Sequence, residues 1–180
     1  MHKRWFAVLS LMIATAQSSK AQDAGRVGIT FQVPAALGFI WHATDQIALR
    51  PEFNISKSTT TFSSSSGESR QGNLAWELAV SAPFYLSNRD NVRTYVSPRL
   101  GFTRFSFDQP TSASTPESKT NQYSYSGSFG AQYAPIKRLN IFGETGYGYS
   151  TTSNSQSQFS SSSNSWSMRS NVGVILYFGP

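Results

Sequence analysis

The chain has 180 residues, a length that suits one domain, and it contains no cysteine. Charged residues account for 13 % of it and aromatic residues for 14 %, with a formal net charge of +6. Without cysteine, a disulfide framework is excluded, and so is a lipoprotein anchor, which requires an N-terminal cysteine. No apolar run approaches the roughly 18 residues that a membrane helix needs, so no such helix is predicted.

The first residues have the pattern of a secretory signal peptide. Lys3 and Arg4 form a charged start, residues 5–16 are largely apolar, and small residues follow. Their spacing predicts cleavage after Ala21, with Ala16 as a second option. The alternative interpretation of this stretch is a buried N-terminal helix.

The expected organisation is therefore a signal peptide at residues 1–21, exported by a Sec-type route, and one mature domain at residues 22–180. Removal of residues 1–21 lowers the formal charge from +6 to +3, because it removes Lys3, Arg4 and Lys20. A balance this close to neutral does not imply nucleic-acid binding.

The mature chain alternates between apolar and polar residues with a period of two, which is typical of strands with two different faces. In residues 74–86, apolar side chains such as Leu74 and Leu78 occupy even positions, and Glu77 lies between them. No mature segment shows a helical period. The pattern predicts strands at residues 47–56, 74–86, 92–102, 123–133, 139–149 and 166–178.

The connections between these strands alternate in length. Short turns at one edge and long loops at the other describe an antiparallel meander. Turn-forming residues predict tight turns at residues 43–46, 88–91 and 135–138, and longer polar loops near residues 63–70, 108–120 and 150–165.

The N-terminal stretch at residues 27–41 keeps one parity throughout, so a single long strand is compatible with it. Strand direction favours a hairpin instead. If the tight turns lie at the periplasmic edge, the strand before residue 43 runs toward that edge, and a periplasmic N-terminus then requires one earlier strand that runs outward. The hairpin has strands at residues 27–33 and 37–42 and a turn at residues 34–36, which brings the total to eight strands.

The charged residues of the strands fall on the polar face, together with most of the glycine and serine. A soluble barrel turns its charges toward water, whereas a membrane barrel encloses them and exposes its apolar face to lipid. We therefore expect an all-β fold, an antiparallel up-and-down transmembrane β-barrel of eight strands, whose interior has room only for side chains. The predicted lumen charge network comprises Arg50, Glu52, Glu77, Arg93, Arg99, Glu144 and Arg169. The predicted interfacial girdle of aromatic residues comprises Trp41, Phe84, Tyr123, Tyr125, Tyr147, Tyr149 and Trp166.

The last strand carries a further motif. Asn171, Gly173, Leu176 and Phe178 resemble in type and spacing the C-terminal signal that outer-membrane proteins present to the barrel-assembly machinery. The aromatic residue usually ends that signal, whereas two residues follow it here. With its strand number, alternation and loop asymmetry, the mature chain resembles the small eight-stranded outer-membrane barrels, those like OmpX and the transmembrane domain of OmpA. This resemblance implies a monomer in the bacterial outer membrane of a Gram-negative envelope.

The sequence contains no recognisable constellation for catalysis, and we expect no enzyme, no cofactor and no metal. His42 is the one histidine of the mature chain, and its place beside a predicted turn indicates a solvated turn residue. The many serines have no base near them, so nucleophilic catalysis lacks its second member. The glycine-rich residues 143–148 lie within a predicted strand, where glycine makes room between lumen side chains or beneath a tyrosine.

The interior charges have two possible roles. Buried charges are costly unless they are paired, so a salt-bridged plug that seals the barrel is the first interpretation. A narrow gated pore, in which an Arg–Glu pair switches partners, is the alternative. On the lipid face, Lys57 and Arg104 lie near the outer strand ends, within reach of lipopolysaccharide phosphates. The alternative is that they belong to solvated extensions of the strands beyond the membrane.

The predicted function is that of an outer-membrane barrel with a structural or surface-interaction role and a closed lumen. The alternatives are a small passive or gated pore and a secreted soluble β-barrel that carries an apolar ligand. The expected surroundings are outer-membrane lipid and lipopolysaccharide, and the sequence names no partner for the loops.

Overall fold

The computed structural model describes residues 24–34, 36–64, 67–89, 91–108, 118–156 and 159–178. No helix long and apolar enough to cross a membrane occurs in these ranges. The predicted signal peptide at residues 1–21, with both of its cleavage options, lies outside them. The strands are β1 (Val27–Val33), β2 (Ala36–His42), β3 (Ala48–Ser64), β4 (Gly67–Ser81), β5 (Phe84–Arg89), β6 (Val92–Asp108), β7 (Ser118–Ile136), β8 (Leu139–Gln156) and β9 (Phe159–Phe178).

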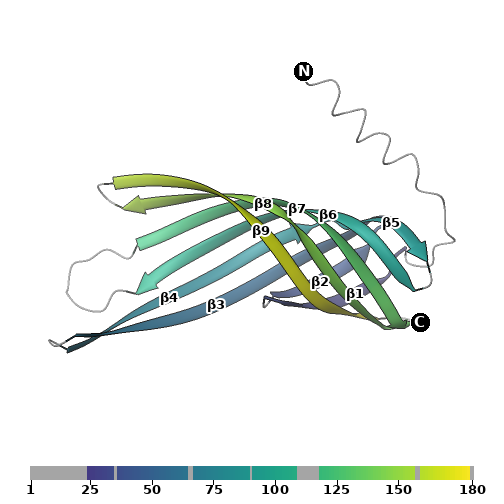
Figure 1. Ribbon diagram of the computed structural model, residues 1–180, viewed down its shortest axis with the longest axis horizontal. Coiled ribbons are helices and arrows are strands. Elements are labelled where there is room, and N and C mark those ends of the chain that lie inside the picture. Colours follow the sequence, from purple (N-terminus) through teal and green to yellow (C-terminus); the bar gives the residue numbers. More distant parts are fainter. Residues whose placement is uncertain are drawn as a thin grey trace, which may run out of the picture.

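The strands form one antiparallel sheet that closes into a barrel (Figure 1). β1 pairs with β9, and β4 and β5 both pair with β6, so β4 and β5 are two segments of one strand. The interruption falls at Ala82 and Pro83, within the strand predicted at residues 74–86, because proline has no N–H for the ladder. Counted in this way the barrel has eight strands, which confirms the predicted fold class.

The ring of backbone contacts is complete at the tight-turn end. There β3 and β5 meet through a bridge between Ile47 and Phe84, and the Ala48 N–H donates to the Pro83 carbonyl at 3.0 Å. A membrane barrel requires such closure, because lipid cannot satisfy an open sheet edge.

Side chains alternate between the lumen and the outside along the strands. In β2, Ile40 is buried, whereas Phe39 and Trp41 are exposed on the outside. The exposed face carries large apolar side chains in every strand, while Arg50 and other charged residues are buried in the lumen. This inside-out arrangement is typical of a barrel in lipid and argues against a soluble carrier.

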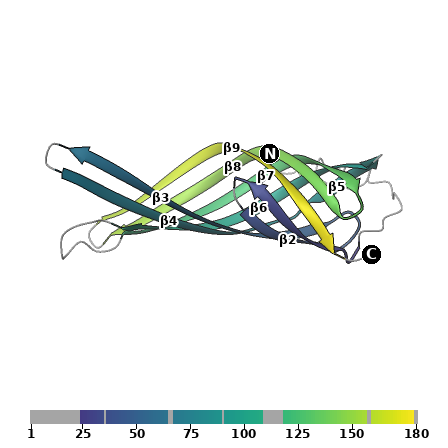
Figure 2. The same ribbon diagram turned by 90° about the horizontal axis from the view of Figure 1, so that it is seen from below.

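The N-terminal stretch forms two strands, as strand direction predicts. β1 and β2 pair from Val27 with Trp41 to Gln32 with Ala36. β1 begins beside the end of β9, where Val27 pairs with Phe178, so both ends of the described barrel lie at the tight-turn edge. Figure 2 shows this hairpin as a short element beside longer strands.

Two stretches predicted as polar loops are paired strands instead. β3 and β4 stay in register as far as Ser64 and Gly67, and β8 and β9 as far as Gln156 and Phe159. The loop prediction is wrong there because polar residues occupy both faces of these ladders, so no apolar alternation marks them. Of the third predicted loop, residues 109–117 lie outside the described residues.

Candidate functional site

The tight-turn end of the lumen is filled by buried rings and polar groups, which we term the aromatic plug. His42 Nε2 lies 2.9 Å from the Tyr177 hydroxyl, and the His42 ring stacks on Tyr85 with centroids 5.5 Å apart. The Tyr85 hydroxyl donates to Gln132 Oε1 at 2.9 Å, and Gln132 Nε2 donates to the Tyr177 oxygen at 3.3 Å. The plug is completed by the buried residues Ile40, Ala48, Tyr95, Phe142 and Ile175.

The expectation that His42 is a solvated turn residue is wrong, because its side chain is fully buried in the aromatic plug. His42 is the last residue of β2 and shares its parity with Gly38 and Ile40, which also face the lumen. The period-two alternation of β2 therefore places the His42 side chain in the lumen. The buried rings of Tyr85, Tyr95 and Tyr177 were not predicted, because charge identifies only some of the residues on the lumen face.

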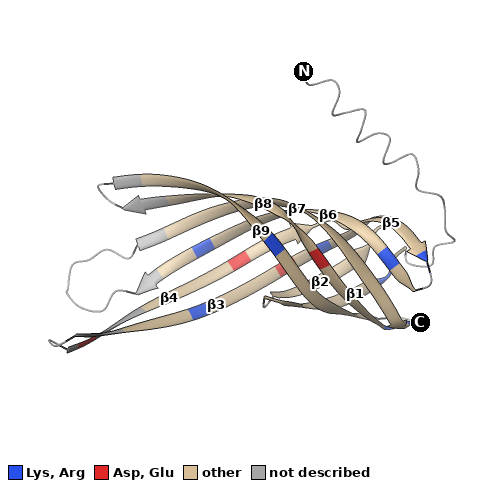
Figure 3. Ribbon diagram, viewed as in Figure 1, with Lys and Arg blue, Asp and Glu red and all other residues tan. Residues whose placement is uncertain are grey.

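Five of the predicted lumen charges form one ion-paired cluster in the middle of the barrel, which we term the charge network (Figure 3). Arg50 donates from Nε to Glu52 at 2.9 Å and from Nη2 to Glu144 at 2.6 Å. Arg99 donates from Nε to the other Glu52 oxygen at 2.8 Å and from Nη2 to Glu77 at 2.9 Å. The pairs link β3, β4, β6 and β8 across the lumen.

Neutral side chains donate further hydrogen bonds to Glu52 and Glu144. Ser81 donates to Glu52 at 3.0 Å, and both Ser128 and Asn171 donate to Glu144 at 3.3 Å. Multiple hydrogen bonds of this kind offset the cost of removing charge from water. The network encloses a cavity of only about 10 Å³, close to the space of one water molecule.

The other two predicted lumen charges lie apart from these ion pairs. Arg93 is buried in the aromatic plug, with its guanidinium carbon 4.4 Å from the Tyr85 ring centroid. Arg169 lies on β9, lines the small cavity of the charge network, and makes no ion pair with any described residue. Charged residues at lumen-facing positions of the alternation therefore lie at different depths along the barrel.

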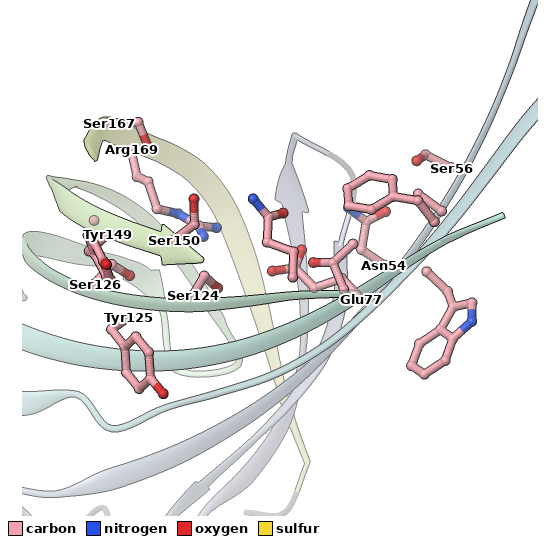
Figure 4. Close-up of a pocket in the computed structure, with 16 residues that line it drawn as sticks. Asn54, Ser56, Glu77, Ser124, Tyr125, Ser126, Tyr149, Ser150, Ser167 and Arg169 are labelled. Carbon is pink, nitrogen blue, oxygen red and sulfur yellow. The ribbon is translucent and has the colours of Figure 1, made fainter. Parts of the chain in front are cut away.

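Beyond the charge network the lumen widens into a cavity of about 320 Å³, which we term the vestibule (Figure 4). Serine, threonine, asparagine and glutamine make up much of its wall. Its two charged residues are Glu77 on β4 and Arg169 on β9. The vestibule is thus a polar chamber whose floor is the charge network.

Lumen glycines make room for the layers. A Cβ atom at Gly130 would collide with the Tyr95 ring, and one at Gly146 would collide with the backbone of Gly127 on the adjacent strand. Gly143, of the same glycine-rich stretch as Gly146, has no neighbour closer than 4.0 Å to such an atom. The stretch at residues 143–148 lies within β8.

The predicted girdle residues face outward in two groups. Trp41 and Phe84 lie toward the tight-turn end, and the others lie toward the far end, where Trp166 contacts the Tyr147 and Tyr149 rings at centroid distances of 5.9 and 4.9 Å. The far group is completed by the exposed residues Tyr123 and Tyr125.

The four residues of the C-terminal motif divide between the two faces of β9. Leu176 and Phe178 are exposed on the outside. Asn171 bonds to the charge network, and a Cβ atom at Gly173 would collide with the Phe142 ring. Packing alone therefore explains the glycine at position 173.

In the described part of the chain, no group of three His, Cys, Asp or Glu residues is arranged to hold a metal.

Solved structures with a similar fold are outer-membrane proteins. A major outer membrane protein from Thermus thermophilus superposes with a TM-score of 0.54 at 12 % identity, over 85 % of this chain and 99 % of that chain. Two further structures are more distant. CarO from Acinetobacter baumannii has a TM-score of 0.41 at 12 % identity, over 86 % of this chain and 98 % of that chain. Ail, the attachment invasion locus protein of Yersinia pestis, has a TM-score of 0.37 at 13 % identity, over 85 % of this chain and 95 % of that chain. No family model and no curated protein matches the sequence. The Thermus likeness supports the fold, that of an outer-membrane β-barrel.

Proposed function

We propose that this protein is a non-enzymatic outer-membrane barrel with a structural or surface-interaction role, whose lumen is closed. The observation that carries this proposal is the charge network, in which Arg50 and Arg99 cross-link four strands through three carboxylates. Below it the aromatic plug fills the lumen and encloses His42, so the imidazole is not accessible to a substrate. Both layers leave little space for an ion or a solute.

We infer a location in the outer membrane of a Gram-negative envelope, reached by Sec-type export, and folding as a monomer by the barrel-assembly machinery. The exposed apolar face supports the membrane location. Lys57 and Arg104 belong to β3 and β6, at the far end of the apolar face, where they could contact lipopolysaccharide phosphates. The β3–β4 and β8–β9 hairpins project beyond the girdle residues and offer polar surface for a partner (Figure 1).

The test combines gel mobility with conductance. A closed membrane barrel resists SDS until it is heated, so the outer-membrane fraction should contain a band that shifts on boiling. The purified protein should give no steady current in a planar bilayer. Regular single-channel steps would overturn the closed lumen and support the pore, and recovery in the soluble fraction without a shift would overturn the membrane location.

A further inference from the structure

The barrel wall has a lateral gap above the β1–β2 hairpin. β1 and β2 have 7 residues each, whereas β3 has 17 and β9 has 20. β1 pairs with β9 only from Val172 to Phe178, and β2 pairs with β3 no further than Phe53. Across the described ranges, the remainder of β9 and of β3 has no strand neighbour on this side.

The gap lies at the depth of the lipid-facing surface. On β9 the outward apolar side chains continue beyond Val172 to Met168 and Trp166, and Trp166 belongs to the far girdle group. Apolar side chains around the gap are strongly exposed, at 73 % for Val33 and Met168 and 67 % for Trp166, and Ile55 and Val172 are 61 % exposed, as is Ile136 at the tight-turn end of β7. Of these residues, Ile55, Met168 and Trp166 lie on the stretches of β3 and β9 that have no described strand beside them on this side.

The backbone edges of the gap require polar contacts. Unpaired N–H and C=O groups that face hydrocarbon are strongly unfavourable, so acyl chains alone cannot fill this space. An occupant must therefore combine hydrogen-bonding atoms with an apolar chain. An amphiphile satisfies both demands, whereas an apolar solute satisfies only one.

The gap leads directly into the vestibule. Asn54 and Ser56 of β3 and Ser167 and Arg169 of β9 line the vestibule, so the two strands that border the gap are also two of its walls (Figure 4). The charge network closes the vestibule floor, so a polar head that enters from the side can pass no further toward the tight-turn end.

The charges of the vestibule favour a head with one charge of each sign. Arg169 makes no ion pair with any described residue, and Glu77 uses only one carboxylate oxygen, Oε1, for Arg99. The charge network holds Arg50 and Arg99 against three carboxylates, and Arg169 brings the sum to zero. A zwitterionic head meets both groups and preserves this neutrality.

We propose that the vestibule binds the head of a zwitterionic phospholipid that enters through the gap between β3 and β9. The phosphate is held by Arg169, the ammonium group lies toward Glu77, and the acyl chain leaves the barrel beside Ile55 and Met168. This proposal rests on the membrane location proposed above.

The test is native mass spectrometry of the folded mature barrel in a nonionic detergent. The probes are lysophosphatidylethanolamine, lysophosphatidylglycerol and monoacylglycerol with the same acyl chain. We expect one adduct with the zwitterionic probe. Arg169→Gln should weaken it by roughly tenfold, the loss expected for one charge-assisted hydrogen bond.

Two further variants sharpen the result. Glu77→Gln should also weaken the adduct, whereas Arg89→Gln, at an exposed position on β5, should leave it unchanged. Arg169 has no ion pair with a described residue to lose, so its variant should fold, and the boiling-dependent gel shift checks this. Equal binding by wild type and Arg169→Gln would overturn the site, and a preference for the anionic probe would overturn the zwitterionic assignment.

The same preparation separates this proposal from the function proposed above. A folded barrel that shifts on boiling and does not conduct, yet forms no specific adduct, overturns only the lipid site. A conducting barrel overturns the closed lumen whatever the adduct result.

Discussion

Single glycines determine how tightly the lumen can be filled. Replacing Gly130 with alanine places a methyl group against the Tyr95 ring, which is enclosed in the aromatic plug. Overpacking of this kind costs about 1–3 kcal/mol, so Gly130→Ala should lower the free energy of unfolding by that amount. Urea unfolding of the protein in lipid vesicles measures the change.

The matched control lies on the same strand. An alanine at Gly127 meets no atom within 4 Å, so Gly127→Ala should leave the free energy of unfolding nearly unchanged. Equal effects of the two variants would show that strand propensity, and not contact with Tyr95, sets the requirement for glycine.

Arg50 is the more deeply buried of the two cations that make the ion pairs of the charge network. Its side chain is 2 % exposed and pairs with both Glu52 and Glu144, so Arg50→Ala leaves the buried Glu144 without its cation and Glu52 with Arg99 alone. Removing one partner of a buried pair costs about 3–5 kcal/mol, and we expect the free energy of unfolding to fall by that amount. Arg89→Ala, at an exposed position, is the control and should change the free energy of unfolding little. A loss as small as this for Arg50→Ala would refute the stabilising role of the charge network.

For a single residue, the sequence predicts whether its side chain faces the lumen or the lipid, but not how deep in the barrel it lies. Alternation places Arg50, Arg93 and Arg169 on one face, and they occupy three layers of the lumen. Which Arg meets which Glu depends on strand register, and register is not encoded in a period of two. The ion pairs therefore do not follow from the sequence pattern.

At the scale of elements, the apolar period located the parts of the strands that face lipid. The hairpin of β1 and β2 also followed from strand direction. The polar extensions of β3, β4, β8 and β9 could not be predicted, because water satisfies both faces there and selection for apolar alternation is absent. The break at Pro83 was hidden because Phe84 and Leu86 resume the same outward parity.

The outer part of the β8–β9 hairpin should be dispensable for folding. Thr152 pairs with Ser163, and Trp166 marks the girdle below them, so replacing residues 153–162 with an Asn-Gly turn removes only the extension beyond the membrane. We expect the boiling-dependent gel shift to persist and the free energy of unfolding to change by no more than about 0.5 kcal/mol. Loss of the shift would show that the extension is needed for the barrel to form.

At the scale of the whole molecule, the lumen is asymmetric along its axis. The aromatic plug fills one end, the charge network closes the middle, and the vestibule opens at the far end and toward the gap. The closed layers coincide with the complete ring of strands, and the vestibule coincides with the missing part of the wall. A sealed floor beneath a laterally open chamber suits binding better than conduction.

The placement of the barrel in lipid predicts a penalty that depends on depth. Phe129 is 53 % exposed and lies on β7 between Tyr133, near the tight-turn end, and Tyr125 of the far girdle group. An arginine on the lipid face near the bilayer midplane costs about 2–4 kcal/mol, so Phe129→Arg should destabilise the protein in vesicles by that amount. Thr151→Arg, beyond Tyr149 on β8, should change stability little, because its charge lies in the polar interface. In a soluble barrel an exposed phenylalanine would tolerate the same change within about 0.5 kcal/mol, so equal stability of both variants in vesicle titrations would contradict the lipid-facing assignment.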